Sequence, residues 1–271
     1  MKKNVLIIGA GGVGHVVAHK CAQHSDVLGD IHIASRTFAK CAAIVLSVHK
    51  KGNLKTGRKL VAHALDAVDI EKTIELIRST RSEIVVNVGS PFLNMSVLSA
   101  CLATGAAYVD TAIHEDPLKI CESPPWYANH EWTRRSECEK AGVTAVLGAG
   151  FDPGVVNAYA RLAKDEYFDR VESIDIVDVN ADDHGRYFAT NFDPEINLRE
   201  FTGEVWSWQE GRWKSNEMFE IRKAWNLPVV GSCATYLTGH ERSTLSRRTL
   251  GCQTSDSGWA SASATSGSST C

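Results

Sequence analysis

The chain has 271 residues, enough for two domains of ordinary size, and 44% of them are hydrophobic. Its 29 basic and 32 acidic residues are scattered and give a net charge of −3, which argues against a nucleic-acid partner or a membrane-surface patch. No apolar run approaches transmembrane length, and the eight cysteines form no C-x-x-C pair, which argues against a zinc or redox motif. We therefore expect a cytoplasmic protein with reduced thiols, no metal site and no membrane contact.

A short apolar run that ends in glycines opens the chain. Residues 5–8 are a continuous apolar stretch typical of a strand buried on both faces of a parallel sheet, and the glycines that follow have G-x-G-x-x-G spacing. In this turn the first glycine permits a sharp bend, the second lets the backbone approach a pyrophosphate, and the third lets a helix pack close to the strand. The sequence therefore predicts a dinucleotide cradle at Gly9, Gly11, Gly12, Val13 and Gly14.

Strand and helix signals then alternate through residue 148. A helix follows the glycines and ends before Gly29, and the segment 117–132 has no clear period. The alternation predicts a Rossmann-type, doubly wound parallel sheet of the α/β class in a domain of residues 1–148. The later strands are expected at 30–35, 60–64, 83–88, 107–111 and 143–147, and the later helices at 38–50, 68–80, 95–104 and 134–141.

The end of the second predicted strand indicates which dinucleotide binds. An NAD site usually carries Asp or Glu there, which holds the ribose 2′-hydroxyl, but this chain has Ser35, Arg36 and Thr37. A guanidinium can bind a phosphate bidentately, so these residues favour NADP(H) over NAD. The alternative is that Arg36 only caps a surface turn.

A second turn follows the strand expected at 83–88. Ligands of open α/β sheets lie at the carboxyl edge, so Val88, Gly89, Ser90 and Pro91 are predicted to run beside the cofactor ribose and nicotinamide. A purely structural turn is the competing explanation for Pro91. Asp110, near the end of the next expected strand, and His114, just after that strand, fall at the same edge.

The pattern changes after residue 148. The segment GAGFDPGVVN is rich in turn formers and resumes a helix at Val155, which indicates a hinge beside the cofactor, and Asp152 and Pro153 within it are predicted to contact substrate. Alternating apolar residues follow from Val171, and then a tryptophan-rich region. This pattern suits a mainly antiparallel sheet, so residues 149–240 are expected to be a partial α+β domain for substrate binding and dimerisation.

The last 31 residues, 241–271, differ from everything before them. Fourteen of them are Ser or Thr, a composition typical of a disordered tail. The segment CQTSDSGWAS can also be encoded so that the same nucleotides, read from the third position, give PDIRFWMGF. We therefore expect a shifted reading frame from near Glu241 and a truncated second domain. Codon degeneracy permits such readings by accident, which is the alternative.

These motifs together carry a family resemblance. GAGGVG, the pair Ser35 and Arg36, NVGSPF, YVDTA, GAGFDPGVVN and TNFDPEINLRE occur in order and resemble the saccharopine dehydrogenase family, in particular its carboxynorspermidine dehydrogenase branch. The resemblance implies an NADPH-dependent reductase that condenses aspartate β-semialdehyde with a diamine, and a homodimer when full length. The alternatives are saccharopine reductase, which joins α-aminoadipate semialdehyde to glutamate, and a truncated nucleotide-binding protein without catalysis.

The implied reaction needs proton transfer and a cation for the substrate carboxylate. Asp110 is the first candidate for the acid–base role, with capping of a turn as the competing explanation, and His114 is the alternative because imidazole titrates near neutrality. Arg199 is the candidate for the carboxylate. Glu115 and Asp116 could attract a distant ammonium, although a solvated surface charge explains all three of these last residues as well.

Overall fold

The fold was obtained as a computed structural model, which describes residues 2–119, 129–171, 174–180, 185, 193–199, 202, 204–209, 212–238 and 258–265. It divides into two compact units, Met1–Glu115 with Ala128–Phe151, and Asp116–Tyr127 with Asp152–Cys271. The division after Phe151 lies three residues beyond the expected boundary at residue 148. Nothing in the sequence pattern indicated that the residues from Asp116 belong with the second unit.

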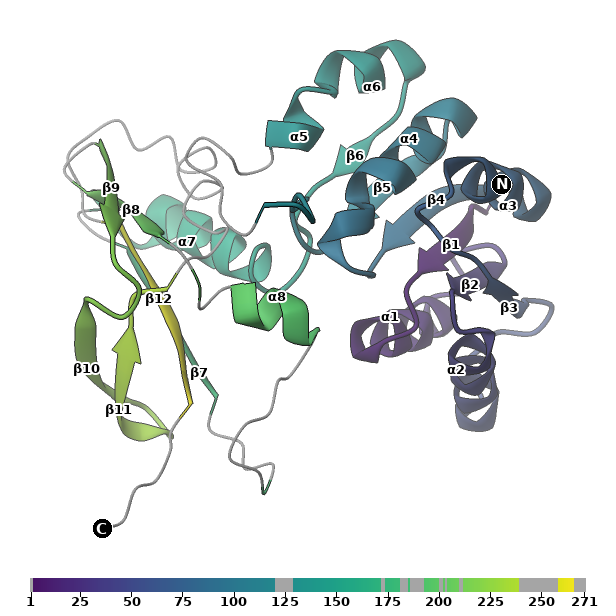
Figure 1. The fold of residues 1–271 in the computed structure, drawn as a ribbon. Coiled ribbons are helices and arrows are strands. Elements are labelled where there is room, and N and C mark those ends of the chain that lie inside the picture. The colour runs from purple at the N-terminus through teal and green to yellow at the C-terminus, as the bar shows by residue number, and fades with distance from the viewer. Residues whose placement is uncertain are drawn as a thin grey trace. The chain divides into compact units, whose positions relative to one another are not determined.

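A six-stranded sheet with the order β3-β2-β1-β4-β5-β6 forms the centre of the first unit (Figure 1). Every neighbouring pair is parallel, which confirms the predicted doubly wound sheet. Each crossover needs a covering helix, and this requirement explains the alternation seen in the sequence. The strands are β1 (Asn4–Ile8), β2 (Ile31–Ser35), β3 (Leu60–Ala64), β4 (Ser82–Asn87), β5 (Ala107–Asp110) and β6 (Ala145–Val146).

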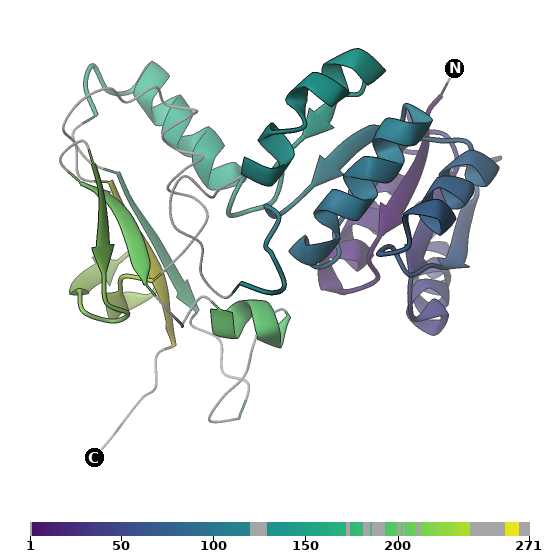
Figure 2. The ribbon, with the colours of Figure 1, turned by 45° about the horizontal axis from the view of Figure 1, so that its top comes forward.

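Helices cover both faces of this sheet. Leu6 and Ile8 of β1 pack with α3 (Ile70–Thr80) and α4 (Asn94–Thr104), whereas Val5 and Ile7 pack on the opposite face. That opposite face is covered by α1 (Gly12–Gln23) and α2 (Phe38–Lys51), as Figures 1 and 2 show. Burial of both faces explains why β1 is apolar at every position.

Three short helices complete the first unit: the 3₁₀ turn η1 (Pro91–Leu93), α5 (Asn129–Trp132) and α6 (Arg135–Ala141). The segment 117–132 was expected to be irregular, and that expectation is wrong for its last four residues, which form α5. A four-residue helix is too short to show a helical period in the sequence.

The second unit contains two small sheets. Strands β10 and β11 pair antiparallel, and a second sheet has the order β7-β12-β8-β9, in which β7 and β12 are parallel and the other pairs antiparallel. The mainly antiparallel character agrees with the sequence pattern. Its elements are α7 (Val155–Glu166), β7 (Ile174–Asn180), α8 (Pro194–Arg199), β8 (Val205–Gln209), β9 (Arg212–Asn216), β10 (Arg222–Leu227), β11 (Gly231–Tyr236) and β12 (Gly258–Thr265).

The strand β12 lies in the tail that was expected to be disordered. That expectation is wrong for its eight residues, which pair with β7 along their length. The rest of residues 241–271 lies outside the described residues, and the expected frame shift stays a prediction.

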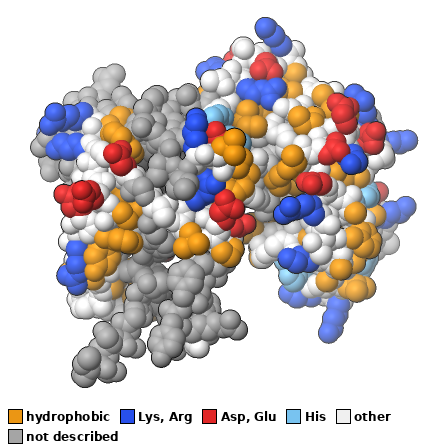
Figure 3. Space-filling model, in the orientation of Figure 1, with side chains coloured by type: hydrophobic (Ala, Val, Ile, Leu, Met, Phe, Trp, Pro, Cys, Tyr) orange, Lys and Arg blue, Asp and Glu red, His pale blue; other side chains and the backbone are white. Residues whose placement is uncertain are grey.

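Charged side chains of both signs are interspersed over the face shown in Figure 3. Among the described helices, none has the length and apolar character required to cross a bilayer.

Candidate functional site

The glycine turn between β1 and α1 is shaped by close backbone contacts. Gly9 has a φ of 113°, and a Cβ at this position would lie 2.7 Å from the carbonyl oxygen of Val88. A Cβ on Gly14 would overlap the carbonyl oxygen of Gly9. Both positions therefore require glycine, the first for the bend against β4 and the second for the approach of α1, as the spacing predicts.

The middle of the turn is open. A Cβ built on Gly11 or Gly12 would have no neighbour within 4 Å. Gly11 is the N-cap residue of α1, and within the described residues no side chain caps that end of the helix. The amide N–H groups of the first turn, which includes the exposed Val13, therefore remain available, and they suit phosphate oxygens. Open space above unsatisfied amides fits the pyrophosphate of a dinucleotide.

A short polar turn follows β2 and leads into α2. The Ser35 hydroxyl accepts a hydrogen bond from the backbone N–H of Thr37 at 3.2 Å and donates to the Thr37 carbonyl at 3.1 Å. Ser35 therefore closes this turn. Arg36 is exposed, and its guanidinium has no hydrogen-bond or ion-pair partner within the described chain. The printed contacts of this turn come from Ser35, and the exposed Arg36 lies at the strand end, where its predicted role as a phosphate ligand stays a prediction.

The loop after β4 lies against the glycine turn. The Val88 N–H donates to the carbonyl of Ile8 at 2.8 Å, and the Ser90 hydroxyl accepts from the N–H of Phe92 at the start of η1. The Gly89 N–H donates to the Asn87 side chain at 3.2 Å, and Pro91 is buried. The structure therefore brings residues 88–91 and the cradle to one edge of the sheet.

Asp110, the last residue of β5, is only 1% exposed. Its Oδ1 accepts from the Gly148 N–H at 2.5 Å, and its Oδ2 accepts from the Asn94 side chain at 3.3 Å. Its backbone carbonyl also accepts from the N–H of Ala149 at 2.8 Å. Burial raises the pKa of Asp110 to about 7, aided by the Glu131 charge and opposed by the Gly148 hydrogen bond. Asp110 therefore fastens the chain beyond β6, and this favours a positioning role over direct proton transfer.

Asn94, the first residue of α4, joins several segments of this edge. Its side-chain NH₂ donates to the Ala112 carbonyl at 2.8 Å, to Glu131 at 3.2 Å and to Asp110. Its side-chain oxygen accepts from Asn87 at 2.8 Å. The buried amide thus connects the loops after β4 and β5, and connected polar networks of this kind fix the loops they join.

His114 is held at both its backbone and its ring. Its backbone N–H donates to Oε1 of Glu131 at 2.8 Å, and its Nδ1 lies 3.1 Å from the carbonyl oxygen of Pro91. A carbonyl only accepts, so Nδ1 carries the proton and Nε2 is the basic nitrogen of the neutral ring. The His130 ring lies edge-on, with 4.9 Å between the ring centroids. A fixed imidazole with a defined tautomer suits proton transfer.

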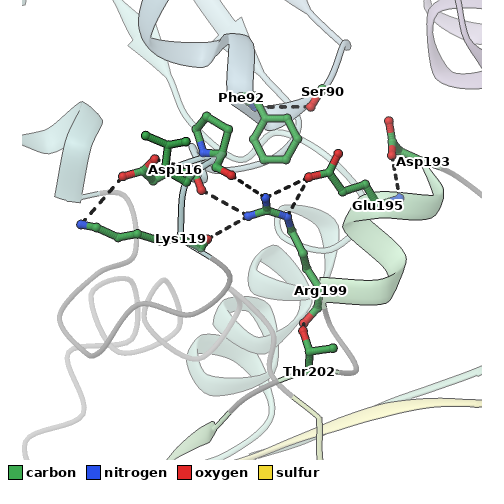
Figure 4. A network of polar contacts seen from close by, with 10 residues as sticks. Ser90, Phe92, Asp116, Lys119, Asp193, Glu195, Arg199 and Thr202 are labelled. Carbon is green, nitrogen blue, oxygen red and sulfur yellow. Dashed lines mark hydrogen bonds and ion pairs between the residues drawn. The ribbon is translucent and has the colours of Figure 1, made fainter.

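Arg199 lies in the second unit, and its side chain is 10% exposed. Figure 4 shows its guanidinium among the polar groups of Asp116, Lys119 and Glu195. Its Nη1 donates to the carbonyls of Asp116 and Lys119, at 3.2 and 2.8 Å, and its Nη2 donates to the carbonyl of Pro117 at 2.9 Å. Its Nε and Nη2 also donate to Glu195, at 3.3 and 2.9 Å. The five N–H groups of the guanidinium are thus directed at protein oxygens. In this arrangement Arg199 clamps residues 116–119 instead of offering a fork to a substrate carboxylate.

Asp152 and Pro153 begin the second segment of the second unit, and Pro153 is buried. The glycine turn, residues 35–37 and 88–91, Asp110 and His114 all lie in the first unit, most of them at one sheet edge. Across the described ranges, no group of three or more His, Cys, Asp or Glu side chains has the geometry of a metal site.

Two residues of the site escaped sequence reasoning, Asn94 and Glu131. Glu131 lies in the segment that lacked a period. Asn94 was placed just before the expected helix, and its partners Asp110 and Glu131 are 16 and 37 residues away along the chain. The NVGSPFLN stretch, with two asparagines around a turn, was the available signal.

Comparison with known proteins adds to this geometry. Residues 5–146 match the saccharopine dehydrogenase NADP binding domain. The chain is 44% identical over 238 residues to carboxynorspermidine synthase of Vibrio alginolyticus, covering 88% of this chain and 58% of that protein. It is 38% identical over 237 residues to carboxyaminopropylagmatine dehydrogenase of a Synechocystis species, covering 88% of this chain and 56% of that protein. The chain therefore spans less than two thirds of the length of these curated relatives.

A solved structure shows the same fold. Apo saccharopine dehydrogenase (L-Glu forming) from Saccharomyces cerevisiae superposes with a TM-score of 0.68 at 17% identity, covering 96% of this chain and 55% of that one. The domain match confirms NADP(H) as the predicted cofactor, in agreement with the open cradle and the unshielded Arg36. By its NADP-binding domain and its relatives, the chain belongs to the saccharopine dehydrogenase family.

Proposed function

We propose that the protein is an NADPH-dependent reductase that joins aspartate β-semialdehyde to a diamine, giving carboxynorspermidine or carboxyspermidine. The observation that supports this most directly is the 44% identity to the Vibrio alginolyticus synthase. The chain covers 58% and 56% of two curated relatives, so their activity enters here as a proposal for this chain. A homodimer and a cytoplasmic location belong to the same proposal.

The reaction makes modest demands on the protein. A primary amine adds to the aldehyde carbon and water leaves, which gives a C=N bond, and a hydride on carbon with a proton on nitrogen then gives the secondary amine. NADPH, when bound, supplies the hydride and is oxidised to NADP⁺. The protein must hold the nicotinamide and the substrates in register and must deliver and remove protons.

In the proposal, residues of the first unit bind the cofactor and transfer the proton. The glycine turn binds the pyrophosphate, Ser35, Arg36 and Thr37 receive the 2′-phosphate, and residues 88–91 border the ribose and nicotinamide. His114 carries the proton, because its tautomer is fixed by Pro91 and leaves Nε2 basic. Asp110 stays a candidate for proton transfer, although its hydrogen bonds favour a positioning role.

The second-unit residues have less direct support. Asp152 and Pro153 remain proposed substrate contacts. Arg199 could reach a substrate carboxylate only by exchanging its bonds to residues 116–119.

A second candidate function is nucleotide binding without turnover. The observation that favours it is the coverage of 58% of the Vibrio relative. A shifted reading frame from near Glu241 would produce such a chain, and sequencing the gene through this codon tests that part directly. A shifted frame that encodes no family-like continuation would dispose of it.

The assay is NADPH oxidation by the purified chain with aspartate β-semialdehyde and, in separate reactions, 1,3-diaminopropane, putrescine and agmatine. Oxidation that requires both substrates supports the reductase. Oxidation with α-aminoadipate semialdehyde and glutamate instead would identify a saccharopine reductase. Tight NADPH binding with no oxidation in any arm would leave the non-catalytic function.

A further inference from the structure

Glu131 of α5 is a buried carboxylate with one unsatisfied oxygen. The residue is 4% exposed. Its Oε1 accepts from the His114 N–H at 2.8 Å and from the Asn94 amide at 3.2 Å. Its Oε2 is buried and has no hydrogen-bond partner among the described residues. A buried carboxylate oxygen without a donor is costly, so its presence in a folded site requires an explanation.

A second buried carboxylate lies beside it, and no cation compensates either one. Asn94 donates to both Glu131 and Asp110, so a single amide joins the two acidic groups. Asp110 also accepts from the backbone N–H of Gly148 and interacts with the Tyr108 hydroxyl, and Glu131 accepts from the backbone N–H of His114. In the described part of the chain neither carboxylate forms an ion pair. The Glu131 carboxylate, buried beside a second acid and without a cation, is therefore a site that a positively charged ligand would satisfy.

The position of this site fits the proposed chemistry. Glu131 holds the backbone of His114, the residue proposed to carry the proton, so its carboxylate lies next to the loop that follows β5. That loop is at the carboxyl edge of the sheet, where ligands of this fold bind. An alkylammonium group offers three N–H donors and one positive charge, which matches an acceptor-only oxygen without a donor.

We propose that the Glu131 carboxylate binds an alkylammonium group of the amine substrate, the non-reacting end when the substrate is a diamine. This inference rests on the proposed function and names the residue that selects a cationic substrate. Glu115 and Asp116 were the candidates from sequence, whereas Glu131 has the burial and the unsatisfied oxygen that they lack.

The test measures binding of 1,3-diaminopropane to the full chain by calorimetry, with and without NADPH and in the absence of aldehyde. Glu131→Gln removes the charge but keeps an Oε1 acceptor for His114 and Asn94. The control is Glu139→Gln in α6, an exposed carboxylate paired with Arg135 at 2.9 Å. The neutral probe is 1,3-propanediol, which has the length of the diamine without its charge.

We expect Glu131→Gln to weaken diamine binding about tenfold or more, the size of a lost charged hydrogen bond, and Glu139→Gln to change it by less than about twofold. NADPH affinity and the backbone amide signal of His114 should be unchanged in Glu131→Gln. The diol should bind wild type and Glu131→Gln equally.

Three results would overturn the inference. The first is equal diamine affinity in wild type and Glu131→Gln. The second is absence of diamine binding by a wild-type chain that binds NADPH, which leaves the nucleotide function standing. The third is loss of NADPH binding or displacement of the His114 signal in Glu131→Gln, which indicates a structural role. If wild type binds no NADPH, the proposed function fails, and the diamine comparison on the unloaded chain still decides the inference.

Discussion

The buried carboxyl of Asp110 should make the first unit less stable as the pH rises, and Asp110→Asn should remove this dependence. Burial raises the pKa from 3.8 to about 7 in the folded protein. Between these values the folded state retains a proton that the unfolded state has lost, so stability falls by about 1.4 kcal/mol per pH unit. The total contribution of this proton to the free energy of unfolding is about 4 kcal/mol. It is present in full below the pKa of the unfolded chain and is lost once the pH exceeds the pKa of the folded protein.

The assay is hydrogen exchange of β4 and β5 peptides followed by mass spectrometry from about pH 5 to about pH 8, after correction for the intrinsic exchange rate. Peptides of the first unit are needed because Asp110 lies in that unit and the chain forms two separate compact units. Asp110→Asn also places an NH₂ group opposite the Asn94 amide, which adds an offset that does not depend on pH. Wild type should therefore lose stability relative to Asp110→Asn as the pH rises. A difference between the two proteins that stays constant over this range would refute the reasoning.

Three further predictions concern the cradle, the cofactor phosphate and a histidine pair. Gly11→Ala should fold normally, because its Cβ meets no protein atom, but should bind NADPH poorly, because this Cβ occupies the space left for the pyrophosphate. Gly14→Ala should also lose about 1–3 kcal/mol of stability, since its Cβ overlaps the backbone. Calorimetric Tm and NADPH titration separate the two variants, and equal behaviour would contradict these steric roles of the two glycines. Arg36→Ala should weaken NADPH binding about tenfold or more without changing NADH binding, as measured by fluorescence titration; parallel losses for both cofactors would argue against a 2′-phosphate contact. The ring nitrogens of His32 and His63 lie 3.0 Å apart, and burial lowers the pKa of both, with repulsion from His63 adding to the effect at His32. The unfolded chain therefore binds protons first, and stability should fall as the pH drops below about 6.5. His63→Gln should reduce that loss in the same exchange assay.

Features that depend on neighbouring residues could be read from the sequence. The apolar run of β1 and the spacing of Gly9 and Gly14 are local signals, and the structure gives each the expected steric reason. The strand at Leu60–Ala64 was located to the residue for the same reason, since alternation and flanking turn residues define it.

Features that depend on distant residues could not be read in this way. Arg199 was recognised as a cation, but its partners at residues 116–119 lie about eighty positions earlier and are backbone carbonyls, which carry no sequence signal. Glu131 was missed because its significance comes from its burial and from the hydrogen bonds that its Oε1 accepts from His114 and Asn94. Neither burial nor a hydrogen-bond partner shows in the residue itself.

The double attachment of residues 148 and 149 has a mechanical consequence. The Asp110 carboxylate holds the Gly148 N–H and the Asp110 carbonyl holds the Ala149 N–H, so both residues belong to the rigid end of β5. Both residues therefore move with the end of β5, and the backbone of this connection is first released from it after Ala149. Gly154, with a φ of 134° at the start of α7, closes this stretch at the other end.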